Sequence, residues 1–486
     1  MINYVAPIIV RHGPGGVNPH ANGARRVVDA IDGVPVTALL ERHGSPVFVF
    51  SEGRLRAACR RVRAAFAAHY DDVQLAWSYK TNYLRAICRV FHQEGSWAEV
   101  VSDFEYEKAR NLGIPGARIV FNGPNKSIAA LERAVDEEAL IQVDHFEELA
   151  ALEAIAKQHS GPVRVALRIS LDAGIRPVWS KFGFCLENGE AMRAVRTIAG
   201  SRGGLQLIGL HCHIGTCILA PEAYANAVRR LAGLAFEAGA AGFDIEYFNL
   251  GGGLPSGSTL HGAVFPARQT NPGLDVYARA IGETMSRETR RLRRKPRLFL
   301  ETGRALVDDA GYLLTTVVAN KTFPGGNAPA PSAWDPKGLV APPSGTPVNG
   351  VIVDAGVHLL YTGAWYRFDV LPGREIAGPD IPTKLCGCLC MNIDVIREEV
   401  PLPPVRPGDP LVIHPVGAYN VSQSMQFIAY RPRVVLIDEQ GGDHVIREKE
   451  SLDYIEEMER LPAYLRCAGV GDARGAGRSS TGNDHE

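Results

Sequence analysis

Short apolar runs alternate with amphipathic stretches from residue 46 to about residue 307. Eight of the apolar runs have the length of strands, and the stretches between them repeat their apolar positions with the spacing of helices. Continuous apolar strands separated by helices predict a parallel sheet that is buried on both faces. Eight such units favour a (β/α)8 TIM barrel over the alternative, an open doubly wound sheet, because no GxGxxG motif follows the first run. The eight runs cover residues 75–78, 98–101, 119–122, 140–144, 163–170, 207–213, 247–251 and 298–301.

The pattern changes after residue 307, where runs rich in β-branched residues replace the alternation. These runs cover residues 313–318, 350–354, 411–414 and 433–437, with turn-forming segments at 406–409 and 439–442. Short strands separated by turns predict an all-β domain, either a β-sandwich or a β-barrel. We therefore predict a protein of the α/β plus all-β class, in which the TIM barrel is followed by a C-terminal β domain.

The predicted domain limits follow from these patterns. Residues 1–45 form an N-terminal segment that packs on the β domain, and residues 46–310 form the barrel. The β domain covers residues 311–465 and contains a flexible insertion at 323–349, which is rich in Pro, Gly and Ala. Residues 466–486 are polar and rich in Gly and Ser, and we expect them to be a disordered tail.

The composition is that of an ordinary soluble enzyme. The chain has 486 residues, of which 46% are hydrophobic and 22% are charged, and its formal net charge is -1. A nearly neutral chain without a long apolar stretch predicts no nucleic-acid partner and no membrane partner. Its nine cysteines lack a zinc-ligand spacing, and the N-terminus lacks a signal-peptide pattern. We therefore expect reduced thiols and a cytoplasmic location.

Polar residues gather at the ends of the expected strands, where barrel enzymes hold their active sites. Lys80 follows the first run, and it is either a surface cation or a Schiff-base nucleophile whose pKa is lowered by desolvation. Gly251, Gly252 and Gly253 follow the seventh run. They form either a plain turn or a site where backbone N–H groups approach an anion such as phosphate.

Glu301 ends the eighth run, three residues before Arg304. It can form a solvated salt bridge, or it can pair with the protonated ring nitrogen of a cofactor while Arg304 contacts an anion. His211 and His213 lie on one face of the sixth expected strand. They can chelate a metal, or one of them can face a cofactor while the other supports it. Because no further ligand set accompanies them, we predict no metal.

Three cysteines alternate near the end of the chain, at Cys386, Cys388 and Cys390. They are either three small buried residues or a place where one reactive thiol shuttles a proton.

Together these motifs resemble the fold type III pyridoxal phosphate-dependent decarboxylases, the family of diaminopimelate, ornithine and arginine decarboxylases. The resemblance covers roughly residues 45–462 and rests on six motifs in the order of the family. It implies pyridoxal 5'-phosphate as cofactor and the decarboxylation of an amino acid or an amino-acid-derived metabolite. The six motifs are the lysine at Lys80, HxHIGT from His211, GGG from Gly251, ExGR from Glu301, CxxxD from Cys390 and GAY ending at Tyr419.

The resemblance also implies roles for single residues. Lys80 would form the internal aldimine with the cofactor, His213 would stack on the pyridine ring, and Glu301 would pair with the ring nitrogen. Cys390 would reach the site of a second subunit and help to reprotonate the carbanion, which implies a homodimer with shared active sites. The phosphate would be surrounded by Thr216, Gly251, Gly252, Gly253, Gly303, Arg304 and Tyr419.

Two departures from the family pattern concern the far end of the substrate. The residue after the family's cysteine is usually acidic, whereas this chain has Met391, which cannot neutralise an ammonium group. The Arg-Pro of the diaminopimelate enzymes is replaced by Tyr361 and Thr362, which removes a clamp for a distal carboxylate. The predicted substrate-binding residues of this altered distal pocket are therefore Met391, Tyr361 and Asp394. A D-amino acid, a siderophore precursor or a carrier-tethered amino acid is the substrate hypothesis.

Three other functions remain as alternatives. A fold type III amino-acid racemase would pair the ring nitrogen with an arginine, whereas this chain has Glu301. A non-catalytic regulator built on a decarboxylase scaffold would be expected to lose catalytic residues, which are all present here. A metal hydrolase would use His211 and His213.

Overall fold

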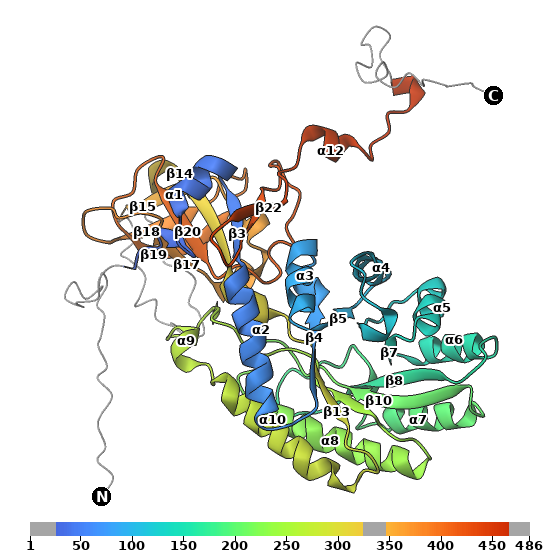
Figure 1. Cartoon of the computed structure of the whole chain (residues 1–486). Helices are drawn as coiled ribbons and strands as arrows, with labels where there is room; N and C mark the ends of the chain where they lie inside the picture. The colour runs from blue at the N-terminus through green and yellow to red at the C-terminus, as the bar shows by residue number, and fades with distance from the viewer. Residues whose placement is uncertain (1–25, 324–346, 466–486) are drawn as a thin grey trace, which may run out of the picture.

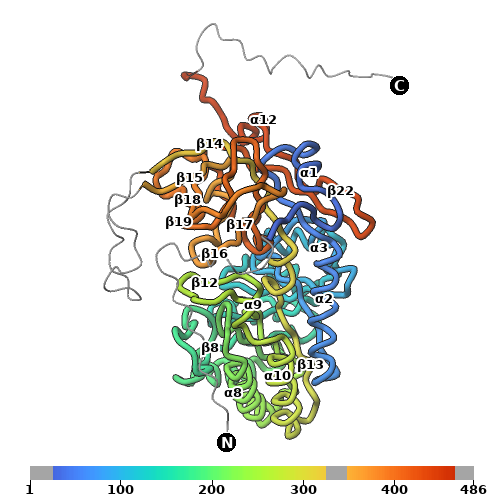
Figure 2. Tube along the Cα trace, turned by 90° about the vertical axis from the view of Figure 1, so that its left-hand side faces the viewer, coloured from blue at the N-terminus to red at the C-terminus, as the bar shows by residue number. Residues whose placement is uncertain are grey.

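A computed structural model describes residues 26–323 and 347–465 of the chain. Residues 1–25, nearly all of the predicted insertion at 323–349 and the predicted tail at 466–486 lie outside this part. The described residues form a barrel and a β domain that lies against its mouth, as Figures 1 and 2 show.

Eight parallel strands close into the predicted barrel. Their order is β4-β5-β6-β7-β8-β10-β11-β13, and β13 pairs with β4 to complete the circle. Each of the eight predicted runs overlaps one of these strands, because a strand enclosed by helices must be apolar on both faces. The strands are β4 (Val73–Ser78), β5 (Trp97–Val100), β6 (Ile119–Phe121), β7 (Leu140–Val143), β8 (Val163–Ser170), β10 (Leu205–His211), β11 (Tyr247–Asn249) and β13 (Arg297–Leu300).

Helices cover the outside of the barrel (Figure 1). In α3 (Arg85–Gln93), the buried residues include Phe91, whose ring stacks on Trp77 of β4 at 4.0 Å between centroids. This contact buries two large rings, and it fixes the helix on the strand that leads to Lys80. The other barrel helices of eight residues or more are α2 (Glu52–Ala67), α4 (Asp103–Asn111), α5 (Ile128–Asp136), α6 (Phe146–Ala156), α7 (Glu190–Gly200), α8 (Pro221–Ala240) and α10 (Leu274–Glu288).

The C-terminal domain is built on one nine-stranded sheet among the described residues. Its long strand β14 (Gly311–Phe323) pairs with three different strands and so connects the two halves of the sheet. The other strands are β3 (Val47–Ser51), β15 (Val348–Val353), β17 (Asp369–Pro372), β18 (Ile381–Cys386), β19 (Val395–Leu402), β20 (Pro410–His414), β21 (Val434–Ile437) and β22 (Asp443–Arg447).

Strand β3 belongs to the β domain although the sequence placed it at the start of the barrel. It pairs antiparallel with β14 and parallel with β21. All five of its residues are buried, and its side chains alternate between two cores. Phe48 and Phe50 join the main core, whereas Val47 and Val49 pack in a second cluster with Leu39 of α1 (Val36–His43). The first element of the barrel is therefore α2.

Small elements complete the described fold. Strand β12 (Thr259–Leu260) follows β11 and pairs with β16 (Tyr366–Arg367) of the β domain at the junction of the two domains (Figure 2). The remaining strands and α-helices are β1 (Ala30–Ile31), β2 (Val34–Pro35), β9 (Phe184–Cys185), α9 (Ala267–Thr270), α11 (Arg304–Val307) and α12 (Leu452–Glu456).

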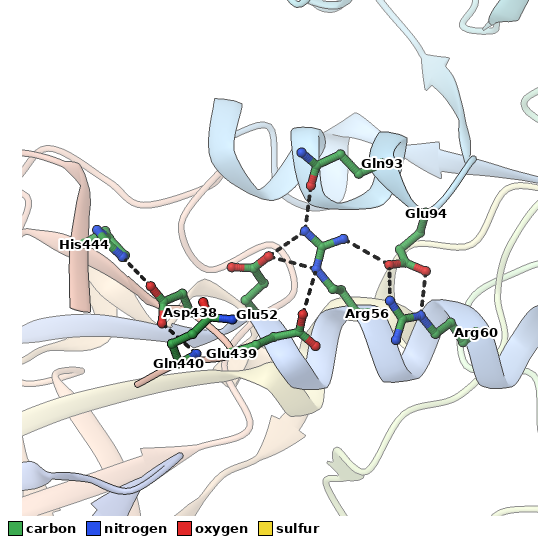
Figure 3. Close-up of polar contacts among 9 residues, drawn as sticks. All are labelled: Glu52, Arg56, Arg60, Gln93, Glu94, Asp438, Glu439, Gln440 and His444. Carbon is green, nitrogen blue, oxygen red and sulfur yellow. Dashed lines mark hydrogen bonds and ion pairs between the residues drawn. The ribbon is translucent and has the colours of Figure 1, made fainter. Parts of the chain in front are cut away.

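A group of charged side chains joins the barrel helices to the β domain at the surface (Figure 3). Arg56 of α2 lies 2.5 Å from Glu52 and 3.0 Å from Glu94, which follows α3. The same guanidinium lies 3.8 Å from Glu439, in the turn between β21 and β22. Its side chain is only 14% exposed, so these contacts are partly protected from water and salt.

Replacing Arg56 with Ala should lower the free energy of unfolding by about 1–2 kcal/mol, because several charge-assisted hydrogen bonds are lost from a partly buried position. Urea denaturation followed by circular dichroism measures this change. Arg60→Ala is the matched control, since Arg60 is one turn away, 61% exposed and paired with Glu94 alone. An equal loss of unfolding free energy in both variants would contradict the larger contribution that we assign to Arg56.

Candidate active site

A cavity of about 610 Å³ opens at the C-terminal ends of the barrel strands. Both domains line it, because the segments around Tyr361 and Tyr419 of the β domain reach the barrel mouth. Ten of the residues predicted from the sequence line this one cavity: Lys80, His213, Thr216, Gly252, Gly253, Glu301, Gly303, Arg304, Tyr361 and Tyr419. Among the predicted site residues, Gly251, Cys390, Met391 and Asp394 do not line it.

Lys80 enters the cavity from the short helical turn after β4 and pairs with a carboxylate. Its Nζ donates to both oxygens of Glu99 on β5, at 2.9 and 2.8 Å. Burial acts to lower the pKa of Lys80, but the charges of Glu99, Tyr419 and Glu301 outweigh it, so the pKa is raised. The expectation that desolvation lowers this pKa is therefore wrong, since the sequence did not reveal the carboxylate beside the amine.

Glu301 lies after β13 as a buried carboxylate that is held by two amides. Its Oε1 accepts from Asn122 at 2.6 Å and from Asn249 at 2.7 Å, and its Oε2 lies 3.5 Å from Nε2 of His211. Burial acts to raise the pKa of Glu301, but His211, Lys80 and the hydrogen bond from Asn122 lower it well below its usual range. The group is thus an anion that faces the cavity.

His213 is a neutral imidazole in a fixed orientation. Burial and the nearby charge of Lys80 lower its pKa to about 3. Its Nδ1 accepts a hydrogen bond from the backbone N–H of Gly252 at 3.0 Å, so the neutral ring carries its proton on Nε2. The ring of Trp179 lies next to it, with 5.1 Å between the centroids and 55° between the ring planes.

The three glycines allow the turn after β11 to lie close to the neighbouring loops. A Cβ at Gly253 would lie 2.4 Å from the carbonyl oxygen of Gly215, and its φ of +90° favours glycine. A Cβ at Gly252 would lie 2.5 Å from the carbonyl oxygen of Glu301. Gly252 and Gly253 therefore bring their backbone to the cavity wall beside the anionic and imidazole groups.

Arg304 lies at the same end of the cavity, between two tyrosine rings. Its guanidinium carbon is 4.2 Å from the ring centroid of Tyr366 and 5.2 Å from that of Tyr419, and its Nη1 contacts Asp308 at 3.0 Å. The buried Nε of Arg304 has no hydrogen-bond partner among the described residues. Tyr419 reaches this position with a left-handed backbone, at a φ of +66°.

Cys390, Met391 and Asp394 lie in a loop between β18 and β19, outside the cavity of their own chain. Cys388 and Cys390 are exposed, so the interpretation of three buried cysteines is wrong. Asp394 is 3% exposed, and its two oxygens accept from the backbone N–H groups of Val357 at 2.8 Å and Leu389 at 2.7 Å. Asp394 therefore shapes this loop through its backbone contacts, and its contact with the substrate stays a prediction.

The prediction from sequence missed several polar residues at the barrel mouth. Glu99 and Asn122 lie inside or at the end of predicted apolar runs, and Asn249 ends β11. A buried polar residue within a strand that is apolar on both sides was the available signal, because such a group needs a partner. Arg168 of β8 and Trp179 also line the cavity and were not singled out.

The described residues contain no group of three or more His, Cys, Asp and Glu side chains arranged to hold a metal ion. Within the same part of the chain, none of the helices has both the length and the apolar character needed to cross a membrane.

The groups that line the cavity fit pyridoxal phosphate, the cofactor that the sequence resemblance implies. Lys80 supplies an amine that can react with the aldehyde of the cofactor, and Glu301 supplies a carboxylate that can pair with the ring nitrogen. The cavity also offers Arg304, with its unpartnered Nε, and the glycine backbone for the phosphate.

Comparisons with known proteins agree with this fit. Residues 52–308 match the family described as "Pyridoxal-dependent decarboxylase, pyridoxal binding domain". Diaminopimelate decarboxylase of Archaeoglobus fulgidus is 30% identical over 451 residues, which cover 90% of this chain and 97% of that protein. Diaminopimelate decarboxylase of Methanocaldococcus jannaschii is 29% identical, over 90% of this chain and 95% of that protein.

Solved structures show the same relationship. The crystal structure of the M. jannaschii enzyme in complex with L-lysine superposes with a TM-score of 0.76 at 28% identity, over 90% of this chain and 97% of that one. The structure of AQ1208 from Aquifex aeolicus superposes with a TM-score of 0.72 at 25% identity, over 89% of this chain and 96% of that one.

Replacing Glu99 with Gln should lower the pKa of Lys80 by about one unit or more, because the nearest opposite charge is removed. The amine then loses its proton at a lower pH. Acylation of Lys80 across a pH series, read by peptide mass spectrometry, measures the midpoint. Glu105→Gln is a buried control, since Glu105 hydrogen-bonds the backbone of Val101 and does not contact the amine. An unchanged midpoint in Glu99→Gln would contradict this assignment.

Proposed function

Because this chain belongs to the family of pyridoxal-dependent decarboxylases, we propose that Lys80 is the residue that binds its cofactor covalently. The chain is a pyridoxal phosphate-dependent amino-acid decarboxylase, a lyase that releases carbon dioxide. The observation that carries the residue assignments is that one cavity brings together an amine, a neutral imidazole, a buried carboxylate and a guanidinium.

When bound, pyridoxal phosphate supplies an electron-withdrawing ring that stabilises the negative charge left on Cα after carbon dioxide departs. Glu301 makes that ring effective, because an ionised carboxylate in a dry site keeps a proton on the ring nitrogen. Asn122 and Asn249 hold its Oε1, so the direction of the carboxylate is set before anything binds.

His213 offers a flat, uncharged surface to the cavity. Its low pKa keeps it neutral, so it can stack on an aromatic ring without adding a positive charge beside Lys80. The hydrogen bond from Gly252 fixes the plane of the imidazole. We propose that Arg304, Thr216, Tyr419, Gly303 and the turn Gly251–Gly253 surround the phosphate, with Gly251 acting through the shape of the turn.

Lys80 and Glu99 form a proton-carrying pair. The amine must lose a proton before it can act as a nucleophile, and the nearest acceptor is the carboxylate at 2.8 Å. Once the Lys80 amine is no longer covalently bound, it can hold a proton or return one. It would do so on the side of the cavity that Lys80 faces.

We propose a homodimer with shared active sites as the acting form. Cys390 and Met391 lie in an exposed loop that does not reach the cavity of their own chain. Their proposed roles, proton donation by the Cys390 thiol and contact with the substrate by Met391, therefore require a second subunit.

The proposed substrate is an amino acid whose far end differs from that of diaminopimelate, with a D-amino acid, a siderophore precursor or a carrier-tethered amino acid as candidates. Tyr361 lines the cavity mouth at the place where a distal carboxylate clamp was expected. Efficient turnover of meso-diaminopimelate or L-ornithine by the purified protein would contradict this proposal. We further propose a cytoplasmic location, which suits the eight free thiols of the described residues.

Lys80→Ala should abolish the cofactor absorbance at about 420 nm and reduce the rate of carbon dioxide release by about a thousandfold or more. Spectrophotometry and a carbon dioxide assay measure the two effects. Lys295→Ala is the control, because Lys295 is a surface lysine that pairs with Asp71. A band that survives in Lys80→Ala would reject the covalent role and would favour a non-catalytic scaffold.

The carbon dioxide assay, run beside a measurement of optical rotation, distinguishes a decarboxylase from a racemase of this fold. A racemase changes the optical rotation of its substrate without releasing carbon dioxide. The anionic Glu301 beside the cavity favours decarboxylation, because it keeps the ring nitrogen protonated and so strengthens the electron sink.

Mixing the Lys80→Ala and Cys390→Ala variants should restore activity to about a quarter of the wild-type value, since half of the dimers are then mixed and each holds one intact site. Activity is measured after the subunits have been unfolded and refolded together. A mixture of Lys80→Ala and Glu301→Gln is the control, because both side chains belong to one chain's cavity and every site stays defective. Equal recovery in the two mixtures would disprove shared sites.

A further inference from the structure

The rim of the cavity consists of aromatic side chains from both domains. Trp179 comes from the barrel segment between β8 and β9, and Tyr361 and Trp365 come from the β-domain segment after β15. Their exposed fractions are 37%, 38% and 50%, which are unusually large for such apolar rings. Tyr361 and Trp365 contact each other edge to face, with 5.4 Å between the centroids.

The β-domain part of this aromatic rim is held in place by the junction of the two domains. Leu260 of β12 pairs with Tyr366 of β16, directly after Trp365. His261 donates its backbone N–H to the carbonyl of Trp365 at 2.9 Å, and its Nε2 lies 2.7 Å from the carbonyl oxygen of Gly363. Tyr361 and Trp365 are therefore presented by an ordered segment, and binding against these two rings does not require that segment to be ordered first.

Most of the charged side chains that line the cavity have partners. Lys80 pairs with Glu99, Glu301 is held by two amides, and Arg304 pairs with Asp308. Arg168 is the remaining charged group of the lining. It is 9% exposed and its guanidinium carbon packs 4.3 Å from the ring centroid of Phe182.

The loop that would complete the site in a dimer also lacks a free charge. Within residues 387–394 the only charged residue is Asp394, and its two oxygens already accept backbone N–H groups. The side chains that the loop leaves accessible include the thioether of Met391 and Ile393, which is 76% exposed. The three rings of the rim and the accessible side chains of this loop therefore supply no charge for an ammonium or a carboxylate at the far end of a substrate.

We propose that the substrate is an amino acid whose side chain ends in an uncharged aromatic or aliphatic group, which packs against Trp179, Tyr361 and Trp365. The proposal rests on the proposed function, and it names the class of substrate for that site. An apolar end gains from burial and from contact with the rings, whereas a charged end that packs on them loses its water without gaining a counter-charge from the rings or the loop.

A substrate panel with matched side-chain lengths tests the proposal. Carbon dioxide release is measured for both enantiomers of methionine, phenylalanine, lysine and glutamate with the cofactor-loaded protein. We expect kcat/KM to be at least about tenfold higher for an uncharged amino acid than for lysine or glutamate. A preference for lysine would overturn the proposal and indicate a cation held by the rings, and a preference for glutamate would overturn it in favour of Arg168 as a carboxylate site.

If the protein turns over the substrates of the panel only slowly, the binding of the product amines provides a second test of the proposal. The change in cofactor absorbance gives Kd for 2-phenylethylamine and for 1,5-diaminopentane. Tighter binding of 2-phenylethylamine supports the proposal, and tighter binding of the diamine overturns it. Failure of the proposed function would look different from failure of the substrate proposal. In that case the protein would show no absorbance band from a cofactor on Lys80, and no member of the panel would release carbon dioxide.

Met391→Glu tests the loop from the second subunit. The new carboxylate should shift the ratio of kcat/KM for lysine over methionine by at least about tenfold toward lysine. Asn392→Glu adds the same charge to the next, exposed residue and should leave the ratio within about twofold of the wild-type value. Equal ratios in the two variants would remove Met391 from the proposed pocket.

Discussion

The pairing of β13 with β4 closes the barrel, and the candidate active site depends on this closure. Leu298 and Leu300 of β13 lie opposite Val73 and Leu75 of β4, so the two ends of the barrel sequence become neighbours. Because all eight strands are parallel, the residues that follow them gather at one mouth. Lys80 after β4 and Glu301 after β13 thereby come to face one cavity, although they are distant in sequence.

Closure also creates a chain of buried polar groups across the mouth. The amide of Asn122 donates to Glu99 at 3.0 Å and to Glu301 at 2.6 Å, so one side chain bridges the two carboxylates. Two buried carboxylates in one network need donors or opposite charges beside them. Lys80 pairs with Glu99 and His211 lies beside Glu301, and this arrangement shifts the pKa values of Lys80 and Glu301.

The β domain takes part in the site because it contacts the turn that carries Lys80. Tyr419 donates its backbone N–H to the carbonyl of Thr81 at 2.8 Å, and Ser422 donates its hydroxyl to the carbonyl of Lys80 at 2.9 Å. A Cβ at Gly417 would fall on the carbonyl of Val307, which explains why the segment before Tyr419 can lie so close to the barrel. The domain that carries Tyr361 and Trp365 is thus attached at the turn that carries Lys80.

The sequence by itself determined the eight strands, the order of the domains and most of the groups at the barrel mouth. Apolar runs and strand-end motifs are local signals, and parallel closure converts them into one site, as it does for Lys80, His213 and Glu301. Tertiary structure alone decided the partners. It placed β3 in the β domain, and it put Glu99 beside Lys80, which raises the pKa of the amine. It also directed Asp394 toward the backbone and left Cys390 outside the cavity of its own chain. These outcomes depend on contacts between segments far apart in sequence, and strand periodicity carries no information about which distant residue lies opposite.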